Sequence, residues 1–599
     1  MAQHSQVWKY FSKSGEGLAR CDLCYKQYQH SGNTSNLRKH LKSRHSKDLS
    51  APSATSTPTK APSSPACSFA SSSSQSFIDS IFNDVSSMQS GAKKSELTNI
   101  ITIMIVKENL PIDHVHGEGF KLMMKNLAPH YLVPDRKTIR RKIDTLYNRM
   151  IELKREEIAN VKNISMTFDL WKDTHNQSSY LGITGHYIKD WEICSVLLSC
   201  FIMTERHTSE NICKSLNKVL KFWNIDSNKV VACVTDNGAN VKKAVGDWIG
   251  QTKHIPCFAH TLNLVVKDAI NNAGNFKDIL VKVRSIVQYF RQSGPAADEL
   301  HKVQPQNKIL KLKQDVETRW NSSYLMLARY IEIQDYVNLA LSHLNDAPPS
   351  VTGAEKEIIE DALKILKPFF SITEEMSAEK VVTLSKVIPI QYCLVSKIRE
   401  MKLDTAVATF LQKSLIKGLD EQFHELEDNM ITVISCILDP RFKKVYIQSA
   451  IALSKALGII DKLLPSASPP PTEIVDDEDN DEDDVWAVHD KLATKRHQSD
   501  RDAQVSLSSK LKLYLDATLV GRKANPLITW SAIQSSFWEI SQLAPMFLCI
   551  PATSVPSERL FSKAGSTLNE KRNRLKPESV NKILFLNSLT VQELKSFIE

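Results

Sequence analysis

The sequence predicts a multidomain protein with a small metal-stabilised unit, a flexible tether, and a larger α/β domain that continues into a long helical part. The chain has 599 residues, which is too many for one hydrophobic core. A Cys-x2-Cys pair is followed by a His-x4-His pair within the first 45 residues. Strand-like alternation begins near residue 160, and helical periodicity replaces it after about residue 260.

Composition limits the classes of protein that fit. Hydrophobic residues make up 42% of the chain and charged residues 24%, so most of it should fold. The net charge of +9 permits a nucleic-acid partner without requiring one. No apolar leader and no apolar run of about 18 residues is present, and the eleven cysteines form no disulfide framework. We therefore expect an intracellular protein with no membrane segment.

Residues 1–49 form the predicted metal-stabilised unit, and they carry nine Lys/Arg against three Asp/Glu, a net charge of +6. Two thiolates and two imidazoles satisfy tetrahedral Zn²⁺, and a short knuckle followed by a helix brings such ligands together. Leu37 and Leu41 fall on the same side of that helix as the first histidine. The predicted zinc ligands are Cys21, Cys24, His40 and His45.

The other side of this helix is polar and basic. Arg, Lys and Asn are the side chains that read base edges in the major groove, so this side suits DNA. The alternative is a structural knuckle that binds protein. Trp8-x2-Phe11 before the Cys/His spacing resembles a BED-type zinc finger, and in that family the finger binds DNA. The candidate DNA-contacting residues are Asn33, Ser35, Asn36, Arg38 and Lys39, with Lys42 and Arg44 beside them.

Two segments connect this unit to the α/β domain. Residues 50–94 are a predicted linker, because their first part is Ser, Ala, Pro and Thr with one charge, Lys60, and cannot bury enough apolar surface to fold. Residues 95–155 predict helices with a break at Pro111 and a basic helix after Pro134.

Residues 156–270 predict strands with one helix among them. A first strand ends at Asp169, and residues 180–187 and 192–203 alternate like a hairpin turned at Lys189-Asp190. A helix capped by Thr208 precedes a strand that ends at Asp236. This β-β-β-α-β order resembles the ribonuclease-H-like fold. Helices dominate residues 271–535, with an acidic disordered loop near 465–500, and helical spacing continues through 536–599.

The two strand-end carboxylates, Asp169 and Asp236, are the strongest candidates for chemistry. Two carboxylates at the ends of neighbouring strands can share divalent ions, and two such ions can activate a nucleophile and stabilise the leaving oxygen of a phosphodiester. Taken alone, an Asp at a strand end is more often a turn or helix cap.

Five short motifs in a fixed order extend this interpretation. Together they resemble the hAT superfamily of DNA transposases from about residue 95 to residue 599, and an N-terminal BED finger is a usual partner in that superfamily. The motifs are Thr-Phe-Asp169-Leu-Trp, Val-Thr-Asp236-Asn-Gly, Cys257-Phe-Ala-His260, Glu317-Thr-Arg319-Trp320 and Ser557-Glu558-Arg559.

The resemblance implies roles for individual residues. Asp169, Asp236 and Glu558 match the metal-binding catalytic triad of the family, which would hold Mg²⁺ or Mn²⁺. His260 matches a residue beside the scissile phosphate. Arg319 and Trp320 match a pair that serves the DNA near the cleavage site, where the Trp stacks on a displaced base. From the residues alone, Glu558 is an ordinary helix acid.

The resemblance also implies an architecture. It consists of a BED zinc finger, a helical DNA-contacting domain at 95–155, and an α/β ribonuclease-H-like core. A large all-α insertion at 271–535 interrupts that core, and residues 536–599 form the C-terminal core helix and the hAT dimerisation region.

Other interpretations of these motifs stay open. Cys257-x2-His260 has no second pair nearby, so a buried Cys and a capping His are the alternative to zinc. Trp320 is of a type usually found in a core. The acidic run at 476–484 lacks the glycine of a Ca²⁺ loop and predicts a solvated segment. The basic run at 571–574 suits phosphate contact or nuclear import.

Two functions follow from the sequence. The first is a metal-dependent transposase that cleaves and transfers DNA strands. The second is a domesticated, catalytically silent transcription regulator that binds DNA through the finger. Both predict a nuclear protein that binds double-stranded DNA and assembles as a homodimer or larger oligomer, with no membrane and no small-molecule substrate.

Overall fold

The computed structural model describes residues 6–15, 18–29, 34–45, 91–173, 178–464, 508–567 and 577–595. The chain divides into two compact units, Met1–Ile81 and Phe82–Glu599. Within the described residues, no helix is both long enough and apolar enough to cross a bilayer. Most of the predicted linker, the acidic run at 476–484 and the basic run at 571–574 lie outside the described residues.

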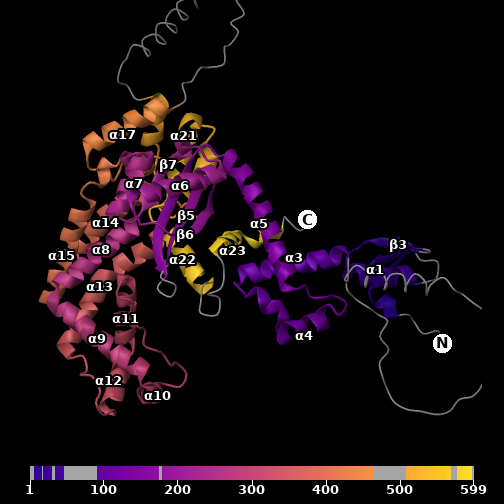
Figure 1. The fold of residues 1–599 in the computed structure, drawn as a ribbon, viewed down its shortest axis with the longest axis horizontal. Coiled ribbons are helices and arrows are strands. Elements are labelled where there is room, and N and C mark those ends of the chain that lie inside the picture. The colour runs from indigo at the N-terminus through magenta and orange to yellow at the C-terminus, as the bar shows by residue number, and fades with distance from the viewer. Residues whose placement is uncertain are drawn as a thin grey trace, which may run out of the picture. The chain divides into compact units, whose positions relative to one another are not determined.

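In its described residues, the first unit has a three-stranded antiparallel sheet and one α-helix (Figure 1). Its core includes Val7, Phe11, Leu37 and Leu41, each at most 3% exposed. So small a core rarely supports a fold without a metal or disulfides. The elements are η1 (Gln6–Lys9), β1 (Phe11–Gly15), β2 (Leu18–Cys21), β3 (Gln27–Gln29) and α1 (Ser35–His45).

The second unit is built on a five-stranded sheet with the order β6-β5-β4-β7-β8. Strands β4, β5 and β6 are antiparallel neighbours, and β7 and β8 run parallel to β4. Helix α6 leads from β6 to β7, which confirms the predicted β-β-β-α-β order. The elements are β4 (Ile164–Asp173), β5 (Ser178–Lys189), β6 (Glu192–Met203), α6 (Ser209–Trp223), β7 (Val230–Thr235), α7 (Ala239–Ile249) and β8 (His254–Pro256).

The predicted hairpin is present, with its turn one residue later than expected. Asp190 and Trp191 both have positive φ, 50° and 59°, the backbone of a tight hairpin turn. Thr208 caps α6 as predicted, and its side chain accepts a hydrogen bond from the backbone N–H of Asn211.

The prediction that β4 ends at Asp169 is wrong, because the strand continues to Asp173. Leu170 lies opposite Leu181 and Trp171 opposite Tyr180 on β5, and such cross-strand pairs extend the ladder. On the side of β7, the pairing stops at Thr167↔Val234. Asp169 therefore lies inside a strand on one side and at an open sheet edge on the other.

The two faces of β4 differ in character. Ile164, Met166 and Phe168 are at most 1% exposed and belong to the hydrophobic cluster shared with α5 and α6. Ser165, Thr167 and Asp169 alternate with them and point to the opposite face. The sheet thus has one apolar face and one face with a row of polar side chains.

Helices before the sheet confirm the predicted break at Pro111 and the helix after Pro134. Asp135 caps that helix by accepting a hydrogen bond from the backbone N–H of Thr138. These elements are α3 (Ala92–Lys107), η2 (Ile112–His116), α4 (Glu118–Leu127) and α5 (Arg136–Ala159).

Helices also occupy the described residues from β8 to the end of the chain. The first group is α8 (Phe258–Asn272), α9 (Gly274–Gln292), α10 (Gly294–Val303), α11 (Trp320–Glu332), α12 (Gln334–Ser342), α13 (Gly353–Met376), α14 (Val387–Arg399), α15 (Ala406–Phe423), α16 (Met430–Ile437) and α17 (Ala450–Leu463). The second group is α19 (Ser509–Asp516), α20 (Pro526–Ile533), α21 (Trp538–Leu548), α22 (Val555–Thr567), α23 (Pro577–Ser588) and α24 (Val591–Lys595). Short 3-10 turns are η3 (Ser227–Lys229), η4 (Gln251–Lys253), η5 (Leu384–Lys386) and η6 (Leu426–Asp428).

The C-terminal helices return to the sheet. Figure 1 shows α22 and α23, in yellow, beside β5 and β6, and they contact these strands. The Asn581 side chain accepts a hydrogen bond from the backbone N–H of Cys200 at 2.8 Å, which covers part of edge strand β6. The apolar face of α23, including Leu584 and Phe585, is buried against this sheet and α5.

Candidate metal centre and active site

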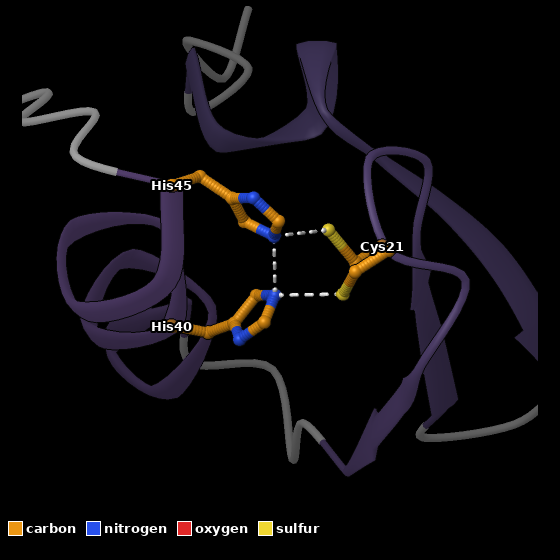
Figure 2. A group of neighbouring side chains, drawn as sticks. Cys21, His40 and His45 are labelled. Atoms are coloured by element: carbon orange, nitrogen blue, oxygen red, sulfur yellow. Dashed lines mark hydrogen bonds between the residues drawn. The ribbon is translucent and has the colours of Figure 1, made fainter. Parts of the chain in front are cut away.

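In the first unit, the four predicted zinc ligands converge on one point. Cys21 ends β2, Cys24 lies in the turn that follows, and the two histidines lie on α1. Figure 2 shows Cys21, His40 and His45 directed toward one another. Phe11 packs edge-on against the His40 ring at 5.8 Å between centroids, which helps to fix the ring.

The separations among these four side chains fit a tetrahedral ion. Cys21 Sγ lies 3.6 Å from His45 Nε2, and Cys24 Sγ lies 3.3 Å from His40 Nε2. The two Nε2 atoms are 3.2 Å apart. Zinc bonds of about 2.3 Å to sulfur and about 2.0–2.1 Å to nitrogen place ligand atoms roughly 3.3–3.8 Å apart. Burial, with nearby His45, lowers the pKa of His40 and keeps its imidazole neutral, as a ligand requires.

The exposed side of α1 carries the residues predicted to contact DNA. Ser35, Asn36, Arg38 and Lys39 are all exposed, and Leu37, His40 and Leu41 are buried. The predicted division of the helix into a packed side and a polar side is therefore confirmed. Asn33 lies outside the described residues.

In the second unit, the three acids line one cavity of about 520 Å³. Parallel pairing of Thr167 with Val234 puts Asp169 and Asp236 at the same level of the sheet. Asp236 directly follows β7, and its Oδ1 accepts a hydrogen bond from the Gly238 backbone N–H at 3.2 Å. Glu558 reaches the same cavity from the first turn of α22.

The electrostatics of this cavity favour a bound cation. Burial, followed by repulsion from Glu558 and Asp236, raises the pKa of Asp169 to about 7. Arg319 is nearby, with Nη2 3.8 Å from a Glu558 oxygen. Because its side chain is 67% exposed, its positive charge offsets the repulsion among the acids only weakly. Among the described residues, the four Cys and His side chains of the finger are the only group of three or more potential metal ligands whose ligand atoms all lie within 4.8 Å of one another. Carboxylates that bind two ions about 4 Å apart from opposite sides can be separated by more than this distance.

Helix α22 is held against the strand that carries Asp169. Ser557 Oγ lies 2.7 Å from Thr167 Oγ1, and the Phe561 ring stacks on Trp171 at 5.7 Å. Gly182, which pairs with Asp169 across the ladder, makes room for this helix. A Cβ at Gly182 would lie 2.9 Å from the Phe561 ring. These contacts explain how an acid 322 positions after Asp236 reaches the sheet.

Cys257 and His260 have different surroundings. Cys257 is fully buried, and its Sγ accepts a hydrogen bond from the Ser554 backbone N–H at 3.3 Å. The Phe258 backbone N–H donates to Ala552 O at 2.9 Å. Cys257 thus ties the start of α8 to the segment before α22, which supports the buried-Cys interpretation. His260 lines the cavity from the first turn of α8.

Asn263 is a cavity residue that the sequence analysis missed. It lies three residues after His260 on α8 and therefore on the same face. Its Oδ1 accepts a hydrogen bond from the Trp320 backbone N–H at 3.2 Å, which holds the start of α11 at the cavity. The signal was the His-x2-Asn spacing inside a predicted helix.

Arg319 and Trp320 both line the cavity, but only Arg319 has an exposed side chain. Trp320 is 4% exposed and packs edge-on against Phe369 at 6.3 Å between centroids. Stacking on a nucleotide base would require this ring to leave its packed position. Glu317, from the same motif, is 3.1 Å from Arg284.

The sequence matches four family descriptions along its length. Residues 5–46 match the BED zinc finger, and residues 167–251 match the ZBED1 RNase-like domain. Residues 255–372 match the ZBED1 RNase-like helical domain, and residues 510–589 match the hAT family C-terminal dimerisation region.

Similar proteins carry two kinds of name. The chain is 25% identical over 527 residues to zinc finger BED domain-containing protein 4 of Homo sapiens, covering 83% of this chain and 43% of that protein. It is 26% identical to the putative AC transposase of Zea mays, covering 80% and 63%. It is 27% identical to the transposable element Hobo transposase of Drosophila melanogaster, covering 53% and 49%.

The chain spans about 43% to 63% of the lengths of these three relatives. Its zinc-ligand cluster lies within the segment that matches the finger family, and its sheet lies largely within the segment that matches the RNase-like family. With a finger at one end, a dimerisation region at the other and relatives named for both, the chain belongs to the BED-finger proteins of the hAT family.

Proposed function

We propose that this protein binds double-stranded DNA through its finger and cleaves and transfers DNA strands at the cavity between β4, β7 and α22. The observation that carries the proposal is the meeting of Asp169, Asp236 and Glu558 in one cavity from three distant parts of the chain. A group of three acids lining one cavity, one of them with a pKa raised to about 7, suits divalent cations better than a purely structural role.

The chain's own residues have separate tasks in this reaction. Asp169, Asp236 and Glu558 would hold two Mg²⁺ or Mn²⁺ ions, which activate a water or 3′-hydroxyl and stabilise the leaving oxygen when bound. His260 and Asn263 would donate hydrogen bonds to phosphate oxygens. Arg319 would contact the DNA backbone. Trp320 would either stay in its packed position and support Arg319, or rotate out of that position to stack on a displaced base.

The other expected features complete the proposal. The helices between residues 271 and 535 would be an all-α insertion in a ribonuclease-H-like core. The C-terminal region would join two copies, in line with its match to a dimerisation region. With DNA as its partner, the protein would act in the nucleus. In the finger, Arg38 and Lys39 on the exposed side of α1 would contact bases or phosphates.

Asp236→Asn tests the catalytic assignment. The full-length variant should bind DNA as tightly as the parent and lose strand cleavage with Mn²⁺, because the amide keeps the shape and removes a charged ligand. Asp268→Asn, at an exposed position on α8, is the matched control and should cleave normally. Normal cleavage by Asp236→Asn would refute the role given to the carboxylates.

A second candidate function is a DNA-binding transcription regulator without catalysis. It is favoured by relatives with BED-protein or regulator names, among them the putative transcriptional regulator tpeD of Talaromyces stipitatus. Both candidates predict DNA binding by the finger. They differ in one measurement, because only the transposase nicks DNA with Mn²⁺ as purified protein.

A further inference from the structure

A row of buried polar side chains lies on the sheet face beneath α22, outside the groups that would touch metal or DNA. Thr167 is 0% exposed, Thr184 5% and His186 3%. Burying such groups costs free energy unless each finds a hydrogen-bond partner. A row of buried polar side chains within a sheet is therefore stable only if these side chains bond to one another or to the backbone.

These side chains form one continuous hydrogen-bond chain. His186 Nδ1 lies 2.9 Å from Ser195 Oγ, and His186 Nε2 lies 2.9 Å from Thr184 Oγ1. Thr184 Oγ1 lies 2.5 Å from Thr167 Oγ1, which in turn lies 2.7 Å from Ser557 Oγ. The chain crosses three strands and ends on α22.

The histidine in this chain is neutral at physiological pH. Complete burial lowers the pKa of His186 to about 4, and no acidic side chain is hydrogen-bonded to its ring in the described residues. A neutral imidazole has one donor and one acceptor nitrogen. It can therefore accept from Thr184 and donate to Ser195. The hydroxyl hydrogens of Thr184, Thr167 and Ser557 then point toward the ring, and the hydroxyl hydrogen of Ser195 points away from it.

The last two members of the row, Thr167 and Ser557, are next to the proposed ligands. Thr167 precedes Asp169 by two residues and lies on the same face of β4. Ser557 immediately precedes Glu558 in the first turn of α22. One hydrogen bond between two fully buried hydroxyls thus joins the strand of one acid to the helix of another.

We propose that the chain Ser195–His186–Thr184–Thr167–Ser557 is the device that positions Glu558 relative to Asp169. The inference rests on the proposed metal-dependent function, and it adds positioning residues to that function. Groups behind metal ligands fix ligand orientation, and their loss typically weakens metal binding about 10–100-fold. Here the row would set where α22 begins and hence where its carboxylate points.

The test uses the full-length protein with Thr167→Val, which keeps side-chain shape and removes the hydroxyl. Thr167→Ser is the conservative variant that should restore the parent behaviour. Thr102→Val is the matched control, since Thr102 is 1% exposed and, within the described part of the chain, its hydroxyl bonds only inside α3, to Thr98 O at 2.7 Å. Ser557→Ala removes the same hydrogen bond from the other side if Thr167→Val does not fold.

Two readouts separate positioning from stability and from catalysis. Hydrogen–deuterium exchange of the α22 backbone reports whether the helix start is held, with no metal present. Titration of Mn²⁺, followed by electron paramagnetic resonance, reports whether the acids still form one site. Thr167→Val and Ser557→Ala should speed exchange in the first turn of α22 and raise the Mn²⁺ Kd about tenfold.

Each outcome decides one question. If Thr167→Ser recovers both readouts and Thr102→Val changes neither, the positioning role stands. If Thr167→Val leaves α22 exchange and Mn²⁺ affinity at the level of Thr102→Val, the positioning role is overturned. A parent protein that binds no Mn²⁺ overturns the proposed function instead, and the exchange data still decide whether the row holds α22.

Discussion

At the scale of single residues, the finger depends on four side chains, and its hydrophobic core is small. Replacing Cys24 by Ser removes one of four ligands that lie within 4.8 Å of one another. Zinc contributes about 10–16 kcal/mol to the folding of isolated finger peptides, and losing a ligand forfeits much of it. We expect Cys24→Ser to lose zinc, unfold residues 17–47 and weaken DNA binding.

Zinc stoichiometry by atomic absorption and DNA affinity by fluorescence anisotropy check this expectation. Cys393→Ser is the matched control, because Cys393 is an exposed cysteine far along the chain from the finger. The ligand assignment fails if Cys24→Ser keeps one zinc per finger and binds DNA with parental affinity.

At the residue scale, the raised pKa of Asp169 also predicts that the stability of the fold depends on pH. Its pKa is about 7 in the fold against 3.8 in the unfolded chain, so the unfolded chain releases this proton first as the pH rises. The fold therefore loses stability between about pH 4 and pH 7, and the loss is complete above pH 7. The full shift corresponds to about 4 kcal/mol as an upper bound.

Asp169→Asn removes this charge and should raise the melting temperature in EDTA. The difference from the parent should be larger at pH 8 than at pH 5, and added Mn²⁺ should stabilise the parent more than the variant. Scanning calorimetry at both pH values measures it, with exposed Asp268→Asn as control. An Asp169→Asn melting temperature at or below the parental value at pH 8 would contradict the origin assigned to the raised pKa.

At the scale of elements, the docking of α22 on the sheet depends on Gly182. Gly182→Ala places a Cβ about 2.9 Å from the Phe561 ring, closer than real contacts allow, so the ring or the helix that carries it must move. We expect weaker Mn²⁺ binding and a loss of stability of about 1–3 kcal/mol, as overpacking typically costs.

A double variant distinguishes a shift of α22 from a general loss of folding. Phe561→Leu shortens the opposing side chain and should recover part of the Mn²⁺ affinity in the Gly182→Ala background. Gly119→Ala is the control, because a Cβ there meets nothing within 4 Å. Equal Mn²⁺ affinity in Gly182→Ala and the parent would show that α22 docks without this close approach.

The elements also show what the sequence could and could not predict. Alternation and turn residues predict the β-β-β-α-β order along the chain and the β5–β6 hairpin, because these signals are local. The sequence predicts a strand end at Asp169 because a short apolar run ends at this charged residue. The pairing of Trp171 with Tyr180 that extends β4 depends on another strand and gives no local signal. The polar row of Thr167 and Thr184 gave no signal, since hydroxyls are common in strands.

Glu558 marks the limit of prediction from residues alone. Nothing around it distinguishes it from other helix acids, and its partners lie hundreds of positions earlier. Only the resemblance to a known family named it, and the structure then placed it in the cavity with both aspartates. Trp320 shows the opposite case, because the sequence left it open as core or contact and the structure shows it packed.

At the scale of the whole molecule, most of the net positive charge and the carboxylate cavity lie in different units. Residues 1–49 carry a net charge of +6 out of +9, and the carboxylate cavity lies wholly in the second unit. Binding to DNA phosphates releases counterions, so log Kobs falls with log salt with a slope of about −0.9 per contact. The exposed Arg38, Lys39, Lys42 and Arg44 on α1 can make several such contacts.

Deleting residues 1–81 should therefore reduce DNA affinity and make the salt slope shallower by about three to four. The remaining chain keeps the compact second unit, so its melting temperature and Mn²⁺ binding should stay at parental values. Anisotropy titrations of duplex DNA from 50 to 300 mM salt measure the slope. Replacing Arg38 and Lys39 by Ala in the full chain is the matched control and should account for about two of the lost contacts. A deletion that leaves the slope unchanged would assign DNA binding to the second unit, whose own basic helix α5 would then carry the contacts.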